Sequence, residues 1–160
     1  MDESDNPVTI NRRFELDAGH RLSRHDFKCQ NFHGHRYKYE VEIRGIPDAE
    51  SGYVIDFSNI KAPIMDAFDH NFLFNQNDPL LKSGVIDMIQ AEQAKEPYLM
   101  DCEPTVENIA RESIRLIWES MATQEQLNVT SITMAVWETP NCDVEMRAIS
   151  PPGEASYRVI

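Results

Sequence analysis

The chain has 160 residues and a formal net charge of −12, from 15 basic and 27 acidic side chains. Hydrophobic residues make up 41% and charged residues 26%, a globular balance that argues against disorder. So acidic a chain is a poor binder of nucleic acid or anionic membranes, and no apolar run reaches the length of a membrane span. Length and composition predict a single domain over residues 1–160.

The first predicted element is a strand over about residues 8–16, because its apolar side chains alternate along the chain. The same parity continues through Ala18 to His20. A second strand is predicted over 37–44, and its apolar parity, extended backwards, takes in His35 and His33. The two strands therefore direct three histidines to the core side of a sheet.

A first helix is predicted over 58–68, with Ser58 as a candidate cap. Pro63 lacks an N–H and is tolerated best near a helix start, so the helix boundary is expected to lie a few residues later. Residues 75–104 carry the weakest pattern, within which 80–93 fits a short amphipathic helix. A second strong helix is predicted over 105–122.

Thr105 can cap this second helix. Two more strands follow, around 132–136 and 144–148, each with alternating apolar residues. The order is β-β-α-(α)-α-β-β. Strands at both ends with helices between them predict an α+β fold, in which helices cover one face of a four-stranded antiparallel sheet.

His20, His33 and His35 are the candidate metal ligands. Three neutral imidazoles plus an open position are a common arrangement for catalytic zinc, and the spacing His33-Gly34-His35 puts two rings on one face of a strand. His25 lies in a charged loop and is expected to be solvated.

Cys29 precedes His33 by four residues, in polar surroundings. A thiol near a dication ionises more readily and can act as a base, whereas a thiol that joins the ligands would make a closed, structural zinc site. Cys102 and Cys142 are expected to be small buried side chains. An odd cysteine count and an acidic N-terminus, which resembles no targeting peptide, predict a cytoplasmic protein with reduced thiols.

Two further carboxylates are candidates for chemistry. Asp69 precedes His70, and an aspartate can fix the tautomer of an imidazole in a proton relay, although adjacent side chains diverge and a surface pair is the alternative. Glu138 shares the parity of apolar strand residues. It is either a strand-end residue in water or a carboxylate matched to paired N–H donors of a ligand.

These residues together resemble the 6-pyruvoyltetrahydropterin synthase / 6-carboxytetrahydropterin synthase family. The resemblance runs from Phe14 to about Met146 and consists of motifs in family order. The motifs are Phe14-Glu15-Leu16-Asp17-Ala18-Gly19-His20, Cys29-Gln30-Asn31-Phe32-His33-Gly34-His35, Gly52-Tyr53-Val54-Ile55-Asp56-Phe57, Asp69-His70, Pro104-Thr105-Val106-Glu107-Asn108 and Trp137-Glu138-Thr139. An insertion at about 76–103 and a short tail at about 150–160 depart from the short bacterial members.

The resemblance implies the tunnelling fold, in which trimers close their sheets into an oligomeric barrel and two trimers stack into a hexamer. It implies a homo-oligomer with sites between subunits and zinc held by the three histidines. Cys29 is then the base, and Asp69 and His70 are the relay or the acid. Glu138 and Thr105 bind the pterin of 7,8-dihydroneopterin triphosphate.

The family catalyses two reactions on this substrate. One eliminates triphosphate to a pyruvoyl product; the other also releases acetaldehyde and leaves 6-carboxytetrahydropterin, a precursor of 7-deazaguanines such as queuosine. The three residues between Cys29 and His33 favour the carboxy type. The alternatives are the pyruvoyl reaction, a non-catalytic pterin-binding module and a structural zinc domain. Because the chain carries −12, a triphosphate requires a locally positive pocket mouth.

Overall fold

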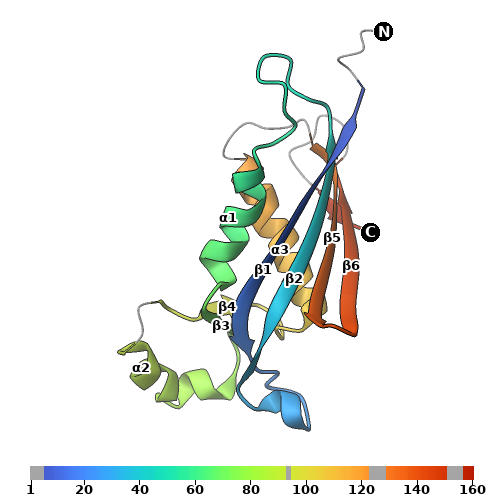
Figure 1. Ribbon diagram of the computed structural model, residues 1–160. Helices are drawn as coiled ribbons and strands as arrows, with labels where there is room; N and C mark the ends of the chain where they lie inside the picture. Colours follow the sequence, from blue (N-terminus) through green and yellow to red (C-terminus); the bar gives the residue numbers. More distant parts are fainter. Residues whose placement is uncertain (1–5, 93–94, 123–128, 151–156) are drawn as a thin grey trace.

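The computed structural model describes residues 6–92, 95–122, 129–150 and 157–160. Within these ranges, one sheet of 7 strands has the order β4-β3-β1-β2-β5-β6-β7 (Figure 1). Its four long central strands pair antiparallel, as the sequence predicts. They are β1 (Val8–His20), β2 (His33–Gly45), β5 (Val129–Thr139) and β6 (Cys142–Ile149).

The prediction of a four-stranded, wholly antiparallel sheet is wrong. β3 (Asn71–Asn75) pairs parallel with β1, β4 (Tyr98–Met100) pairs parallel with β3, and β7 (Arg158–Val159) extends the opposite edge. The physical reason is the length and burial of these strands. β3 buries three consecutive residues and β4 has only three, so neither shows an alternation that a sequence pattern can reveal.

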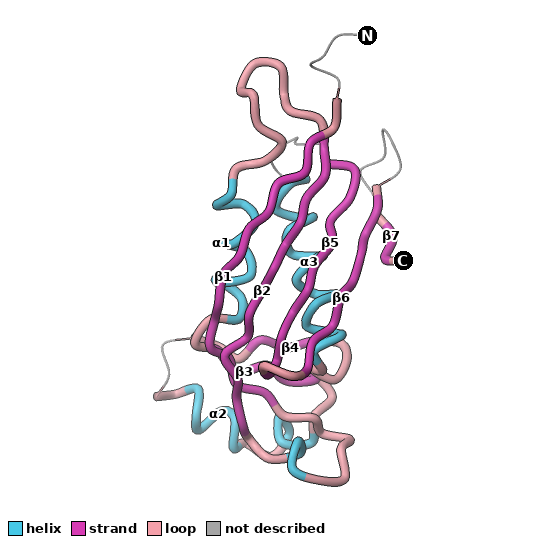
Figure 2. Tube along the Cα trace, turned by 45° about the vertical axis from the view of Figure 1, so that its right-hand side comes forward, coloured by secondary structure: helices cyan, strands magenta, loops and turns pink. Residues whose placement is uncertain are grey.

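Helices α1 (Phe57–Phe68) and α3 (Val106–Ala122) cover the same face of the central sheet, which confirms the predicted α+β arrangement (Figure 2). α1 begins at the Asp56 cap, whose carboxylate accepts a hydrogen bond from the Ser58 N–H at 2.7 Å; Ser58 is not the cap. The helix also continues through Pro63 rather than beginning after it. Its stripe of fully buried residues packs into the core and outweighs one missing hydrogen bond.

The segment between β3 and β4 holds two short helices in place of the single one predicted over 80–93. These are the 3-10 turn η3 (Pro79–Lys82) and α2 (Val85–Gln90), and residues 93–94 lie outside the described ranges. Gly84 separates them with a φ of 76°, a left-handed conformation that ends a helix and that glycine adopts without strain.

The register of β1 and β2 sets the position of the predicted ligands. His20 pairs with His33, Gly19 with Gly34, and Ala18 with His35. A Cβ on Gly34 would lie 2.8 Å from the carbonyl oxygen of Ala18. A glycine is therefore required at this point of the β1–β2 pair, where a Cβ would meet the facing backbone.

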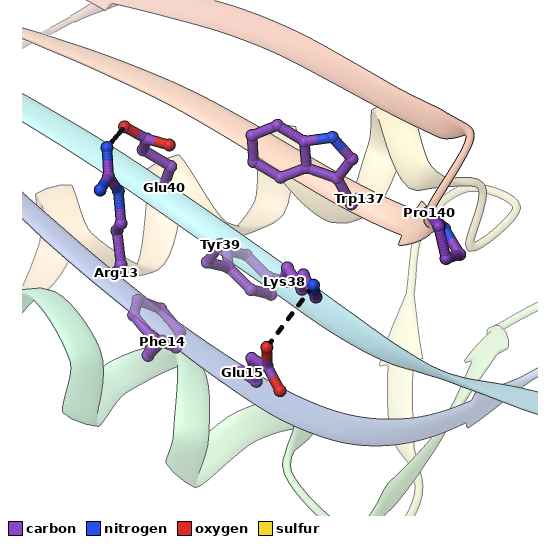
Figure 3. A pocket seen from close by; sticks show the side chains of 8 residues that line it. All are labelled: Arg13, Phe14, Glu15, Lys38, Tyr39, Glu40, Trp137 and Pro140. Carbon is purple, nitrogen blue, oxygen red and sulfur yellow. Dashed lines mark hydrogen bonds and ion pairs between the residues drawn. The ribbon is translucent and has the colours of Figure 1, made fainter.

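The other face of the sheet is open and polar. Cross-strand ion pairs follow it along β1 and β2: Arg13 with Glu40 at 2.6 Å, Lys38 with Glu15 at 3.9 Å and Arg36 with Asp17 at 3.0 Å. Figure 3 shows the first two pairs beside Trp137, where they line a hollow of about 530 Å³. No described helix is long and apolar enough to cross a membrane.

Candidate metal centre and active site

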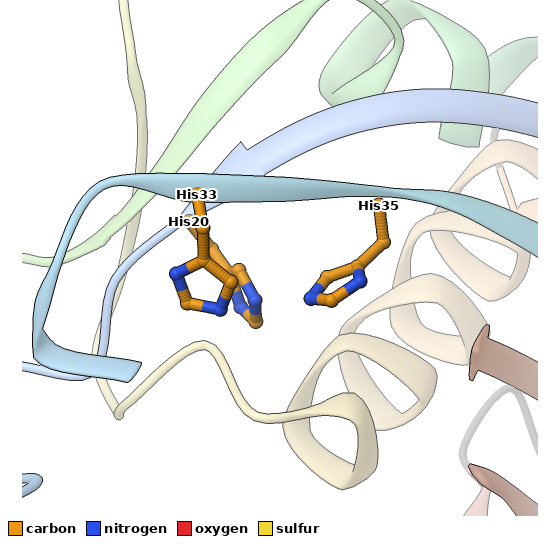
Figure 4. A group of neighbouring side chains, drawn as sticks. All are labelled: His20, His33 and His35. Atoms are coloured by element: carbon orange, nitrogen blue, oxygen red, sulfur yellow. The ribbon is translucent and has the colours of Figure 1, made fainter. Parts of the chain in front are cut away.

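The three predicted histidine ligands converge on the helix-covered side of the sheet (Figure 4). His20 ends β1, and His33 and His35 open β2 two residues apart. One ligand nitrogen from each ring lies within 4.8 Å of the others. The ring centroid of His20 is 4.4 Å from that of His33 and 5.2 Å from that of His35. This spacing suits three ligands of one metal ion.

Backbone carbonyls orient two of the three rings, those of His20 and His33. Nδ1 of His20 lies 2.7 Å from the carbonyl oxygen of Pro104, and Nδ1 of His33 lies 2.8 Å from that of Asn31. Because a carbonyl only accepts, each Nδ1 carries the proton and donates it. The neutral ring then presents the lone pair of Nε2 to the point where the three rings converge. A hydrogen bond from the other ring nitrogen to a carbonyl is the usual second contact of a metal-bound histidine.

Nε2 of His20 is buried and has no hydrogen-bond partner in the described structure. The pKa of His20 is lowered to about 4, chiefly by burial and to a smaller extent by the neighbouring His33 and His35, against the opposing effect of the Pro104 carbonyl. The pKa of His35 is also lowered, chiefly by burial. Neutral imidazoles with an unpartnered buried nitrogen fit a divalent metal ion such as zinc.

Glu138, near the end of β5, lies beside this group. Its Oε1 is 3.4 Å from Nε2 of His20 and 3.7 Å from Nε2 of His35. The Tyr37 ring lies edge-on to both histidines, and burial together with the Glu138 charge raises the pKa of its hydroxyl. The structure thus brings the predicted carboxylate and the predicted ligands together in one chain.

Cys29 lies in the 3-10 turn η2 (Lys28–Gln30), in the loop between β1 and β2. It is half-buried, and its carbonyl accepts a hydrogen bond from the Leu22 N–H at 2.8 Å. Its thiol is not part of the group of ligand atoms within 4.8 Å of one another. A closed site with Cys29 as the fourth ligand is therefore not the arrangement described.

Asp69 and His70 touch each other despite their adjacency in sequence. Oδ2 of Asp69 lies 3.0 Å from Nδ1 of His70, and the backbone of His70 has a positive φ of 52°. The pair precedes β3 and hydrogen-bonds to the backbone of Asp17 at both its N–H and its carbonyl. No described hydrogen bond, ion pair or ring contact joins it to the three histidines. His70 is mostly exposed and lines a hollow of about 630 Å³.

Thr105 precedes α3 and caps it, as predicted: its Oγ1 accepts a hydrogen bond from the Asn108 N–H at 3.4 Å. Its neighbour Pro104 supplies the carbonyl that holds His20. Sequence reasoning missed both carbonyl partners, Pro104 and Asn31, because any residue type can offer a carbonyl and only the fold decides which one meets a ring.

The family model described as 6-pyruvoyl tetrahydropterin synthase matches residues 9–148. The chain is 35% identical over 143 residues to a 6-carboxy-5,6,7,8-tetrahydropterin synthase of Rickettsia bellii, covering 87% of this chain and 99% of the relative. It is 37% identical over 138 residues to one from Haemophilus influenzae, covering 82% of this chain and 92% of that one.

Solved structures of similar fold include a 6-pyruvoyltetrahydropterin synthase of Plasmodium vivax, with a TM-score of 0.65 and 17% identity over 91% of this chain and 100% of that one. A 6-pyruvoyl tetrahydropterin synthase of Caenorhabditis elegans gives 0.58 and 23%, covering 92% and 99%. At these identities the solved structures bear on the fold alone.

Proposed function

Because this chain belongs to the 6-pyruvoyl tetrahydropterin synthase family, we propose that it is a zinc-dependent 6-carboxy-5,6,7,8-tetrahydropterin synthase, a lyase. Its substrate would be 7,8-dihydroneopterin triphosphate, and its products 6-carboxytetrahydropterin, acetaldehyde and triphosphate. The observation that carries the proposal is the convergence of Nε2 of His20 with the rings of His33 and His35 beside the Glu138 carboxylate.

His20, His33 and His35 would hold the zinc. Bound there, zinc would polarise side-chain oxygens of the substrate and make the adjoining C–H groups more acidic. The two backbone carbonyls hold a proton on Nδ1 of His20 and of His33, which favours Nε2 as the atom that would bind the metal.

Glu138 would orient the pterin. A carboxylate offers two acceptor oxygens that match the amino and ring N–H groups of the pterin edge, and such charge-assisted hydrogen bonds are the stronger kind. Thr105 would add a contact, since its hydroxyl can accept from the Asn108 N–H while donating its own proton.

Cys29 would accept a proton from the substrate side chain, and Asp69 with His70 would move protons in the later steps. The 3.0 Å contact between Asp69 and Nδ1 of His70 supports this relay, because the carboxylate fixes the tautomer that leaves Nε2 of His70 as acceptor.

The carboxy reaction is preferred over the pyruvoyl one. Three residues separate Cys29 from His33, and the relatives of 35% and 37% identity carry the carboxy name. The product would enter the synthesis of 7-deazaguanines such as queuosine.

The active form would be a homo-oligomer built of trimers, or two stacked trimers, with sheets joined into a barrel. Sites shared between copies would explain why Asp69 and His70 do not touch the histidine group within one chain. Three free cysteines support a reducing, cytoplasmic setting, and the net charge of −12 disfavours nucleic acid or membrane as partner.

Product analysis tests the proposal. Zinc-loaded protein is incubated with 7,8-dihydroneopterin triphosphate, and carboxypterin with an equivalent of acetaldehyde is expected. A pyruvoyl product would assign the sister reaction. Pterin binding that depends on Glu138 without any turnover would assign a non-catalytic module and refute the enzyme.

A further inference from the structure

Glu103 connects three segments around the histidine group. Its half-buried carboxylate accepts hydrogen bonds from the Ser23 N–H at 2.6 Å, the Ser23 hydroxyl at 2.6 Å and the Asn75 amide at 2.9 Å. Ser23 follows β1 by three residues, Asn75 ends β3 and is buried, and Glu103 itself lies between β4 and α3. One side chain thus holds the ends of two neighbouring strands against the start of a helix.

The backbone of Glu103 is fixed as well. Its carbonyl oxygen accepts hydrogen bonds from the Thr105 N–H and from the side-chain amide of Asn108, both at 2.8 Å. The next carbonyl along the chain, that of Pro104, accepts the Nδ1 proton of His20 at 2.7 Å. A residue held at both its side chain and its carbonyl leaves the following peptide little freedom to turn.

These contacts form a closed path: from His20 along the chain to Ser23, through the Glu103 carboxylate to Pro104, and back to the His20 ring. We infer that Glu103 is a positioning residue for the metal centre, which fixes the Pro104 carbonyl so that His20 presents Nε2 to the metal ion. Glu103 touches neither the metal point nor a ligand nitrogen, and its effect passes through the Pro104 carbonyl.

The carboxylate is the group that this position requires. It must accept three hydrogen bonds from donors that are all fixed by other elements, and two oxygens can do so. Glutamine keeps one acceptor oxygen and replaces the other by a donor, which would face the Ser23 N–H or hydroxyl. Glu103→Gln should therefore weaken the path in part, and Glu103→Ala should remove it.

The inference rests on the proposed metal site, so the test measures zinc binding rather than turnover. Zinc affinity of the full chain is determined by competition with a chromophoric chelator, and the visible spectrum of the Co²⁺-substituted protein reports ligand geometry. Loss of an outer-shell partner of a metal ligand costs about 10- to 100-fold in affinity. That loss and an altered Co²⁺ spectrum are expected for Glu103→Ala, with a smaller loss for Glu103→Gln.

Glu112 on α3 provides a matched control. Its half-buried carboxylate also accepts three side-chain hydrogen bonds, from the Tyr98 hydroxyl and from Nε and Nη2 of Arg115, but it has no described contact with the histidine group. Glu112→Ala should lower the melting temperature and leave zinc affinity and the Co²⁺ spectrum unchanged.

Equal zinc affinity in wild type and Glu103→Ala, or equal losses in Glu103→Ala and Glu112→Ala, would overturn the inference. If Glu103→Ala does not fold, an unchanged affinity and spectrum in Glu103→Gln would overturn it. Wild-type protein that binds no zinc would refute the proposed metal site and the inference with it. A Glu103 effect in a protein without turnover would refute the proposed reaction alone.

Discussion

At the scale of single residues, the candidate site depends on which atom each side chain presents. Residue type and strand parity predicted that His20, His33 and His35 share a face. The tautomers of His20 and His33 are set by the carbonyls of Pro104 and Asn31, which no sequence pattern marks. The Asp69–His70 contact is likewise found only in the structure, where His70 has a φ of 52°.

Glu138→Gln separates a pterin clamp from a metal ligand. The Glu138 carboxylate is close to two of the three histidines. If it binds the pterin, the amide should weaken pterin binding by about 10- to 100-fold, the worth of one charged hydrogen bond, and leave zinc affinity unchanged. Pterin titration and chelator competition measure the two effects, and loss of zinc would identify Glu138 as a ligand instead.

Cys29→Ala separates a base from a structural ligand. The thiol lies outside the group of three ligand nitrogens, so the variant should keep its fold and its zinc. Turnover should fall by about 10²- to 10⁴-fold, the usual worth of a general base. Zinc content by atomic emission and the rate of acetaldehyde release provide the measurements. Simultaneous loss of zinc and fold would instead favour the structural zinc domain.

At the scale of elements, the pairing of β1 with β2 is what delivers the histidines. A regular antiparallel register places His20 opposite His33, and Ala18 opposite His35. The long strands were predictable because each has one buried and one exposed face. The short strands were not: β3 and β4 are held by pairing with neighbours that lie far away in sequence, and β7 has only two residues, too few to show an alternation.

Gly34→Ala tests this close approach. The new Cβ would meet the Ala18 carbonyl at 2.8 Å and push the strands apart beside two ligands. A loss of about 1–3 kcal/mol in unfolding free energy is expected, together with weaker zinc binding. Gly84→Ala is the control: its φ of 76° should cost about 1 kcal/mol without any effect on zinc. Denaturant unfolding measures the free energy, and chelator competition measures zinc affinity. An unchanged zinc affinity in Gly34→Ala would refute the expectation.

At the scale of the whole molecule, the net charge of −12 opposes the approach of a triphosphate. On the open sheet face Arg13, Arg36 and Lys38 are each paired with a carboxylate, so these cations add no excess positive charge. Phosphate recognition by this protein would then rest on the metal and on other local donors. A positive potential at the pocket mouth stays a prediction.

Mixing two inactive variants tests whether sites are shared between copies. His33→Ala should lack zinc, and His70→Ala should lack the relay. If each site combines the histidine group of one copy with the Asp69–His70 pair of another, co-expression should restore up to about a quarter of the wild-type rate. Each variant expressed alone is the control. A mixed preparation no more active than the two variants separately would place the whole site within one chain.

The sequence by itself determined the family, the α+β class, the four long strands, the strong helices and the parity that gathers three histidines. The family follows from the resemblance of its motifs, and the other features follow from periodicity and residue chemistry, which are local properties of the chain. Only the tertiary structure decided the three short strands, the contact of Glu138 with the histidines and the carbonyls that orient their rings. Most of these depend on atoms brought together from distant parts of the chain, such as His20 and Pro104, 84 residues apart. The contact of His33 with the Asn31 carbonyl is local, but it needs the backbone of the β1–β2 loop to turn that carbonyl toward the ring.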